Sequence, residues 1–262
     1  GTGRTLTGRP GPVAEPAPVV LAIDTATPQV SVALAGPAGP LASIHVAGGR
    51  RHGELLAPVI AEVCRLAQRP LQSIDAVAVD VGPGLFTGLR VGVATARALV
   101  SALGVPAVAL TSVEILAAAH RHQPRPVVAV VDARRSEVFW ALFHPTPDGP
   151  VQFAPAAVAS PDTVAAAVGA LAGGALVVGD GGWRYREVFA PLAGVEVAGL
   201  DDAHPSAAVA AGLAVARLSD PGGARGRAEV ADGIEPLYLR PPDVRIGWAS
   251  RPVSVPALDV DG

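Results

Sequence analysis

Residues 22–34, AIDTATPQVSVAL, and residues 130–142, VVDARRSEVFWAL, are two copies of one pattern. Each copy has an apolar run, an aspartate, a polar turn of a few residues and a second apolar run, which is typical of a β-hairpin. Asp24 aligns with Asp132, and the following positions keep this offset of 108 residues. Because the aspartate, the turn length and the second strand agree, we interpret the copies as an internal duplication. A coincidence between two common hairpins is the alternative.

The pattern around the hairpins alternates strands with helices. Apolar runs and helical spacing predict strands over 39–49, 74–80 and 106–110, and helices over 52–68, 87–104 and 111–122. A thinner version follows the second hairpin, with a helix over 160–174, a strand over 175–180 and a helix over 204–220. From about residue 221 the chain reads as loop, apart from an extended segment at 234–240. Strands mixed with crossover helices predict a layered α/β protein of two similar halves, the second one reduced.

The composition fits a folded protein with a large core. The chain has 262 residues, half of them hydrophobic, and a mean hydropathy of +0.41. We expect a Gly/Pro-rich lead-in at 1–17, subdomains at 18–110 and 111–220, and an extended C-terminal segment at 221–262. No uninterrupted apolar run reaches the ~18 residues of a membrane helix, and the first 18 residues lack the apolar core of a signal peptide.

Charge and cysteine content exclude several classes of protein. The net charge is −3, every basic residue is an arginine, and the arginine pairs at 50–51 and 134–135 do not form a longer basic run. We therefore do not expect strong nucleic-acid binding by this chain alone. Cys64 is the only cysteine, so neither a disulfide framework nor a paired-cysteine metal site is expected, and a cytoplasmic location is the simplest interpretation.

A glycine-rich loop, DVGPGLFTGLRVG, occupies residues 80–92 between a predicted strand and a predicted helix. We expect Gly82 and Gly84 to take positive φ, and Thr87 to cap the helix. The helix N-terminus could bind a phosphate. However, Gly88, Gly92 and Ala96 recur every fourth residue, and such a stripe of small residues would allow another helix to approach closely. We favour this packing role over phosphate binding.

The two hairpin-led halves resemble the actin, heat-shock ATPase and sugar-kinase (ASKHA) superfamily, whose halves are RNase H-like. In that superfamily the aspartate-bearing turns face a nucleotide. The glycine loop resembles the signature of two sister families of the tRNA threonylcarbamoyladenosine machinery, the catalytic TsaD family and its partner, the TsaB (YeaZ) family. Residues 86–90, FTGLR, match the TsaB version. Further support comes from residues 21–34, 50–63, 79–99, 110–119, 130–143 and 236–244.

The TsaD resemblance implies a metal motif, Asn-His-x-x-x-His, on the helix at 111–122, where two histidines four residues apart reach one ion. This chain has Ser112 and Leu116 at those positions, so we expect no metal site and no catalytic residue. Glu114 is explained by a capping box with Thr111. His120 and His122 are two residues apart and would point in different directions on a helix, and no G-x-S-x-G motif is present.

The nucleotide side of the ASKHA fold is also degraded. Residues 177–182, VVGDGG, stand where that fold offers a Gly-Gly turn to adenosine, and Asp180 interrupts the turn. We expect no cofactor to be bound independently. Any weak nucleotide or phosphate contact would come from the hairpin aspartates, the first hairpin turn and the glycine loop: Asp24, Thr25, Gly82, Gly84 and Asp132. An aspartate that ends a strand often only caps a turn, which is the alternative.

A binding role remains, and the helices at 52–68 and 87–104 offer the best surface. Their apolar stripe could instead cover the protein's own sheet. The TsaB resemblance implies that this helix pair packs on the matching pair of a TsaD-like subunit, with homodimerisation through the same face when the partner is absent. The expected contact residues are His52, Leu55, Leu56, Val59, Ile60, Val63, Leu66, Gly88, Gly92 and Ala96. We expect Val59→Arg or Val63→Arg to abolish the complex without unfolding the protein.

The resemblance thus implies a non-catalytic subunit that binds and activates a TsaD-like threonylcarbamoyltransferase, which modifies the adenosine next to the tRNA anticodon. It also implies contact with a TsaE-like ATPase, use of ATP and metal by the partner subunits only, contact with tRNA only through the complex, and no membrane contact. The alternative is an ATP- or metal-dependent enzyme of the actin-like fold, either a small-molecule kinase or a glycoprotease-like peptidase. A homodimeric structural protein without a link to tRNA is a third class.

Overall fold

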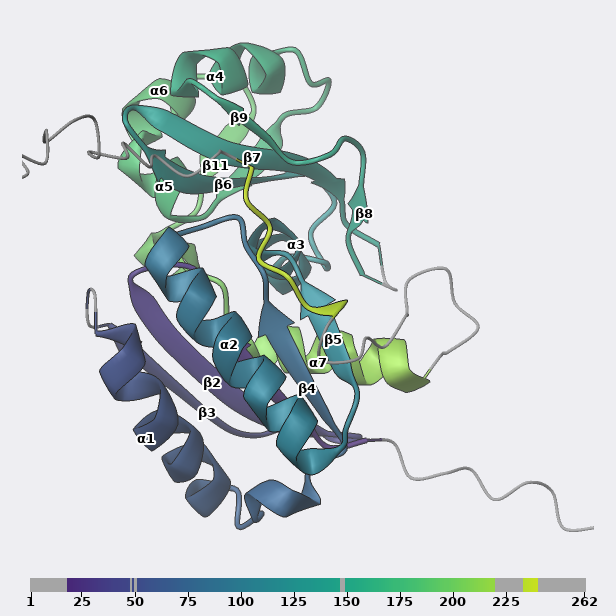
Figure 1. Cartoon of the computed structure of the whole chain (residues 1–262). Helices are drawn as coiled ribbons and strands as arrows, with labels where there is room; N and C mark the ends of the chain where they lie inside the picture. Colours follow the sequence, from purple (N-terminus) through teal and green to yellow (C-terminus); the bar gives the residue numbers. More distant parts are fainter. Residues whose placement is uncertain (1–17, 48, 50, 147–148, 220–232, 240–262) are drawn as a thin grey trace, which may run out of the picture.

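The computed structural model describes residues 18–219, apart from 48, 50, 147 and 148, and residues 233–239. A first sheet has the strand order β3-β2-β1-β4-β5, with β1 to β3 antiparallel and β1, β4 and β5 parallel. The helices α1 and α2 lie side by side on one face of this sheet, and α7 covers the other (Figure 1). The bounds are β1 Val20–Asp24, β2 Gln29–Gly36, β3 Gly39–Ala47, β4 Ala76–Asp80, β5 Ala107–Leu110, α1 His52–Leu66, α2 Phe86–Leu103 and α7 Ala207–Ser219, with a 3₁₀ turn at Leu71–Ser73.

The second sheet repeats the plan of the first. Its order is β11-β10-β6-β7-β8, with β9 also pairing with β7. The hairpin β6–β7 takes the place of β1–β2, and the parallel strands β10 and β11 take the places of β4 and β5. The bounds are β6 Val127–Arg134, β7 Glu137–His144, β8 Val151–Gln152, β9 Ala157–Ala159, β10 Ala175–Val178, β11 Val195–Val197, α4 Pro161–Gly169, α5 Asp180–Arg184 and α6 Arg186–Phe189, with a 3₁₀ turn at Leu200–Asp202. The predicted α/β fold of two similar halves is confirmed, and the second sheet has six strands where the first has five.

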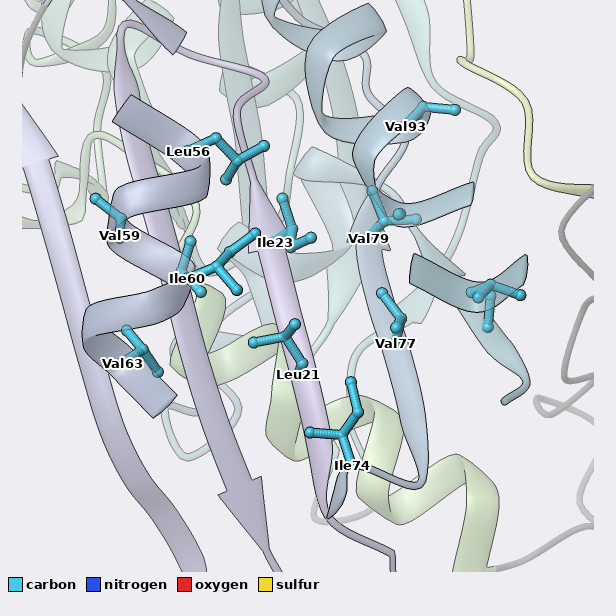
Figure 2. Close-up of a cluster of buried hydrophobic side chains, with 14 of the residues drawn as sticks. Leu21, Ile23, Leu56, Val59, Ile60, Val63, Ile74, Val77, Val79 and Val93 are labelled. Carbon is cyan, nitrogen blue, oxygen red and sulfur yellow. The ribbon is translucent and has the colours of Figure 1, made fainter. Parts of the chain in front are cut away.

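The core of the first half is built from the two faces of β1 and β4. Leu21, Ile23 and Val79 point toward α1 and α2, where they pack with Leu56, Ile60 and Val63 of α1 (Figure 2). The opposite face carries alanines on both strands and on α7, so that helix packs closely on the sheet. Each large side chain removed from water contributes about 1.5–3 kcal/mol. Alternation along two adjacent strands therefore fixes which helices cover which face.

The two hairpins differ in their turns, so the predicted equal turn lengths are wrong. Asp24 lies opposite Ser31, with residues 25–28 between the strands. Asp132 lies opposite Val138, and only residues 135 and 136 separate β6 from β7. Three successive residues at the end of the second hairpin, Arg134, Arg135 and Ser136, have φ between 57° and 62°. This left-handed run closes the turn early, and it is uncommon for residues other than glycine.

Two further segments join the halves. The helix α3 (Ser112–Ala119) places Ile115 in the core of the first half and Leu116 in that of the second. Residues 233–239 run between the halves as an extended segment (Figure 1), with Ile234 in the first core and Leu239 against the second. The Leu237 amide donates to the Val81 carbonyl oxygen at 2.7 Å. α7 lies within the expected segment 111–220 but packs on the first sheet.

Several predicted boundaries need correction. α3 ends at Ala119 rather than 122, and α4 ends at Gly169 rather than 174. Gly173 and Gly174, which the prediction placed in the helix, have left-handed φ values of 85° and 77°. The short elements β8, β9, β11, α5 and α6 were not predicted. The loop expected from residue 221 lies mostly outside the described residues. α2 is the one described helix that could cross a membrane by length and composition, but it carries Arg90 and Arg97 and packs on β4.

Candidate functional site

The site of the first half lies where its two central strands end. Asp24 ends β1 and Asp80 ends β4, and these parallel strands pair Ile23 with Val79 immediately before the two aspartates. Both side chains are buried, with 0% and 1% of their surface exposed. Asp24 Oδ1 accepts a hydrogen bond from the Ala26 amide at 2.8 Å. Asp80 Oδ1 accepts from the Gly82 amide at 2.7 Å and from Ser112 Oγ at 2.8 Å.

The second oxygen of each carboxyl group, Oδ2, has no hydrogen-bond donor among the described residues. Burial raises the pKa of Asp80 to about 6, against hydrogen bonds from Gly82 and Ser112 that lower it. Burial, together with the charge of Asp80, raises the pKa of Asp24 well above its usual value. The charge of Asp180 acts on the pKa of Asp24 in the same direction, so the acids of the two halves lie near one another.

The second half has the equivalent pair, Asp132 and Asp180, in a different setting. Asp180 Oδ1 accepts from the Asp132 amide at 2.9 Å, and Asp132 Oδ1 accepts from the Arg134 amide at 2.9 Å. The side chains of Arg134 and Arg184 lie 3.1 and 3.8 Å from Asp132 Oδ2. Burial raises the pKa of Asp180 to about 6. Arginines thus accompany the acids here, whereas the first pair is buried beside other acids.

The glycine loop is filled by the first hairpin turn. The Leu85 amide donates to the Ala26 carbonyl oxygen at 2.7 Å, and Thr25 Oγ1 donates to the Gly88 carbonyl oxygen at 2.8 Å. A Cβ on Gly84 would lie 2.9 Å from the Ala26 carbonyl carbon, and one on Gly88 would lie 3.2 Å from the Thr25 carbonyl carbon. These glycines therefore admit the hairpin backbone, and the neighbour that approaches the small-residue stripe is this turn rather than another helix.

Two details of the loop differ from expectation. Gly82 has the predicted positive φ, at 107°, but Gly84 does not, because Gly84 is required by the close approach of Ala26. Thr87 does not cap α2: the helix begins one residue earlier, and Leu85 occupies the N-cap position without a side-chain bond. Close packing of the glycines on the hairpin turn therefore accounts for the loop. Asp24 and Asp132 each accept a hydrogen bond from an amide two residues further on, so both cap turns, which is the alternative given for them above.

The two positions of the TsaD metal motif have structural roles. Ser112 is fully buried and bonded to Asp80, and Leu116, 3% exposed, belongs to the core of the second half. Within residues 18–219, apart from four positions, and residues 233–239, no group of three or more His, Cys, Asp or Glu side chains could hold a metal ion. The Thr111 hydroxyl caps α3 through the Glu114 amide at 3.2 Å, but the Glu114 carboxylate pairs with Arg217 of α7 instead of completing a capping box.

The Gly-Gly turn of the second half is also packed tightly against the protein's own backbone. Gly181 and Gly182 are buried at the start of the short helix α5. A Cβ on Gly179 would lie 3.1 Å from the Val130 carbonyl carbon, and one on Gly181 would lie 2.9 Å from the Val131 carbonyl carbon. The turn therefore packs closely on the backbone of β6.

The expected partner face is largely internal to this chain. Most of its residues are buried, and the inward-facing side chains of α1 cover the protein's own sheet: His52, Leu56, Val59, Ile60, Val63, Gly88, Gly92 and Ala96. His52 Nε2 lies 2.8 Å from the Thr27 carbonyl oxygen. Leu55 is half-buried, and Leu66 is 51% exposed. Val59→Arg or Val63→Arg would place a charge in the core, so the expectation that these variants leave the fold intact is wrong.

The outward faces of α1 and α2 are a different set of residues. The two helices lie side by side (Figure 1), and their exposed small or charged residues are Gly53, Glu54, Ala57, Pro58, Ala61 and Arg65 on α1, and Thr87, Arg90, Ala94, Arg97 and Ala98 on α2. We call these residues the outer helix face. At the start of α2, Phe86 stacks on Tyr238 with ring centroids 5.1 Å apart, and the Arg90 guanidinium lies 4.6 Å from the Phe86 ring.

Sequence reasoning missed Asp80 and the hydrogen bond from Ser112 to it, which hold the loop and α3 together. The available signal was an aspartate at the end of a buried strand.

Known proteins that resemble this chain in sequence belong to the tRNA threonylcarbamoyladenosine machinery. A family model described as tRNA N6-adenosine threonylcarbamoyltransferase (TsaD) matches residues 45–166. A tRNA threonylcarbamoyladenosine biosynthesis protein TsaB from Escherichia coli is 28% identical over 236 residues, which cover 89% of this chain and 98% of that protein. An uncharacterised Mycobacterium leprae protein is 39% identical over 150 residues, and one from Mycobacterium bovis is 37% identical over 126. The chain spans about half the length of these two relatives, 40% and 58%.

A solved structure extends the match to the whole fold. YeaZ from Pseudomonas aeruginosa has a TM-score of 0.71 and 30% identity, and the match covers 85% of this chain and all of that one. The two-sheet α/β fold is therefore shared over the whole length of that protein. By this likeness in sequence and structure, the chain belongs to the TsaB (YeaZ) family.

Proposed function

We propose that this chain is a non-catalytic subunit of the machinery that makes threonylcarbamoyladenosine in tRNA, and that it binds and activates a TsaD-like threonylcarbamoyltransferase. One observation carries the proposal: the helix that would hold a metal in TsaD has a serine bonded to Asp80 and a leucine in the core. The names of the TsaB relatives support the pathway. A cytoplasmic location and contact with tRNA only through the complex belong to the same proposal.

The outer helix face is the surface we assign to the partner. Its short side chains would allow the backbone of a facing helix pair to approach closely. Its charged side chains have partners within the chain: Glu54 pairs with Arg51, Arg65 pairs with Glu62, and Arg90 lies over the Phe86 ring. A TsaD-like subunit built on the same fold would present the matching helix pair, and a second copy of this chain could use the same face. A TsaE-like ATPase would then contact the assembled pair.

A matched set of variants tests this surface. Ala61→Arg on α1 and Ala94→Arg on α2 add a charge at exposed positions of the outer helix face, and Ala166→Arg makes the same change on the exposed side of α4. An unpaired charge buried in a packed interface costs several kcal/mol, so the first two variants should weaken TsaD binding by roughly 100-fold or more. Ala166→Arg should bind as the unmodified chain does, and all three should keep the thermal stability of that chain. Equal binding by all of them would show that the partner sits elsewhere.

An independent enzyme is the competing class. Such an enzyme would bind Mg-ATP or a metal on its own, and we propose that ATP and metal belong to the partner subunits. Calorimetry of the isolated chain with Mg-ATP, and elemental analysis of the purified protein, separate the two. A stoichiometric metal or turnover without partners would support a kinase or a peptidase.

A further inference from the structure

The buried carboxyl pair of the first half is a feature that partner binding does not explain. Asp24 and Asp80 end adjacent parallel strands, and both are fully buried. Their Oδ1 atoms are occupied by backbone amides and by Ser112, and their Oδ2 atoms receive no donor from any other described group. The two carboxyl groups nevertheless stand next to one another, because they follow the paired residues Ile23 and Val79 on adjacent parallel strands, and each acts on the pKa of the other. An ionised carboxylate can only accept hydrogen bonds, so two carboxyl groups can form a hydrogen bond to each other only if one of them is protonated.

Among the described residues, the charged groups that act on the pKa values of this pair are all acids. Outside the pair itself, these groups are Asp180 from α5 and Glu114 from α3. Glu114 is itself paired with Arg217 of α7. In the second half, by contrast, Arg134 and Arg184 accompany Asp132. Two adjacent charges at a buried site without a cation are strongly unfavourable, and the usual outcome is that one carboxyl group stays neutral.

We propose that Asp24 and Asp80 share one proton at neutral pH, carried on Asp24 Oδ2 and donated to Asp80 Oδ2. Asp80 is the carboxylate of the pair because its Oδ1 already accepts two hydrogen bonds, whereas that of Asp24 accepts one. The direction agrees with the pKa values, because the contact between the carboxyl groups raises the pKa of Asp24 and lowers that of Asp80. This inference is independent of the proposed partner.

The shared proton would lock three segments together. Asp24 holds the first hairpin turn through Ala26, and Asp80 holds the glycine loop through Gly82 and the first turn of α3 through Ser112. Since α3 connects the two halves, the carboxyl pair is a proton-dependent contact that holds the first sheet to α3. If the proton left, two charges would face each other at this contact, and these segments would separate or the protein would lose stability.

The sign of the pH dependence follows from the proton count. In the unfolded chain both carboxyl groups lose their protons near pH 4, while the folded pair keeps one at neutral pH. The folded state then binds one proton more, so the folding equilibrium constant falls tenfold for each pH unit, until the pair releases its proton. Asp180, with its pKa of about 6, and His45 and His204, whose pKa values are lowered by burial, contribute mainly below pH 7. The range above pH 7 is therefore the one to measure.

Two readouts test the proposal on the full chain. Infrared difference spectra at pH 7 should show the carbonyl band of a protonated carboxylic acid, which Asp24→Asn should remove. The control Asp132→Asn, which keeps an acceptor for the Arg134 amide, should retain the band. Urea unfolding between pH 7 and 8, below the range in which the raised pKa of the buried Cys64 thiol contributes, should show the tenfold decrease for the unmodified chain and a flat profile for Asp24→Asn, whose amide can donate to Asp80 without a proton.

Each contrary result has a definite meaning. If the unmodified chain lacks the acid band at pH 7, or if Asp24→Asn keeps the same pH slope, the proposal is overturned. If MgCl₂ stabilises the unmodified chain at pH 7 but not Asp24→Asn, a cation takes the place that we assign to the proton, and the proposal is again overturned. Should Asp24→Asn fail to fold, Asp80→Asn serves instead, because its amide can donate to Asp24, and the infrared measurement on the unmodified chain still decides.

Discussion

Replacing Gly88 with alanine tests the claim that the glycines of α2 admit the first hairpin turn. In a free helix the change would be favourable by about 1 kcal/mol, because alanine loses less backbone freedom than glycine. Here the added methyl group would lie 3.2 Å from the Thr25 carbonyl carbon, and closer still to its oxygen. Overpacking of a rigid site costs about 1–3 kcal/mol. Displacing the turn would also weaken the bond from Thr25 Oγ1 to the Gly88 carbonyl oxygen, which contributes about 1 kcal/mol. We expect a net destabilisation of about 1–3 kcal/mol.

Gly212→Ala is the matched control for this prediction. Gly212 lies in the middle of α7, is exposed, and has no atom within 4 Å of the position of a Cβ. This variant should be stabilised by about 0.5–1 kcal/mol, the ordinary gain of alanine over glycine in a helix. Urea unfolding at one pH measures both differences, and for a chain of this size each kcal/mol shifts Tm by roughly 2–4 °C. If Gly88→Ala were as stable as Gly212→Ala, the hairpin turn would not be held as described.

Three further predictions concern the same elements. Val63→Arg should unfold the protein or lower its Tm strongly, because Val63 is 0% exposed. Ala61→Arg changes an exposed residue two positions away and should alter the Tm little. Thermal unfolding followed by circular dichroism measures both variants. Ser112→Ala should destabilise the chain by about 1–3 kcal/mol in urea unfolding, because it removes a hydrogen bond to the buried Asp80 carboxylate, and a variant as stable as the unmodified chain would contradict that bond. Burial raises the pKa of Asp180 to about 6, so the protein should lose about 2 kcal/mol of stability as pH rises from 4 to 6, because the folded state keeps this proton to a higher pH than the unfolded chain does. Asp180→Asn should remove this part of the pH profile, and an unchanged profile would contradict the burial described for that group.

Local patterns predicted most of the fold. The hairpins at Asp24 and Asp132, the helices on the first sheet and the glycine loop each have a signal within a few residues, either alternation, helical spacing or a turn residue. The left-handed run at residues 134–136 has no such signal, because arginine and serine rarely adopt it, and it follows from how the second hairpin closes. Short elements such as β11 and α6 depend on the strands already in place and lack a period of their own.

The candidate site shows why apolar stripes mislead about partners. The stripe on α1 correctly indicates burial, but a sequence pattern does not distinguish the protein's own sheet from another subunit, and Val59 and Val63 face the sheet. The outer helix face has no apolar signal at all, since short side chains at exposed positions look unremarkable in a sequence. The bond between Ser112 and Asp80 joins residues 32 apart, and only the packing of α3 on the glycine loop brings them together.

Reconstituted tRNA modification tests the central claim most directly. A TsaD-like subunit is supplied with threonylcarbamoyl adenylate, tRNA and the ATPase, with or without this chain, and the modified adenosine is measured. We predict modification only when the chain is present, none from the chain alone, loss of activity with Ala61→Arg and full activity with Ala166→Arg. Modification at the same rate without the chain, or turnover by the chain without TsaD, would contradict the role of a non-catalytic activating subunit.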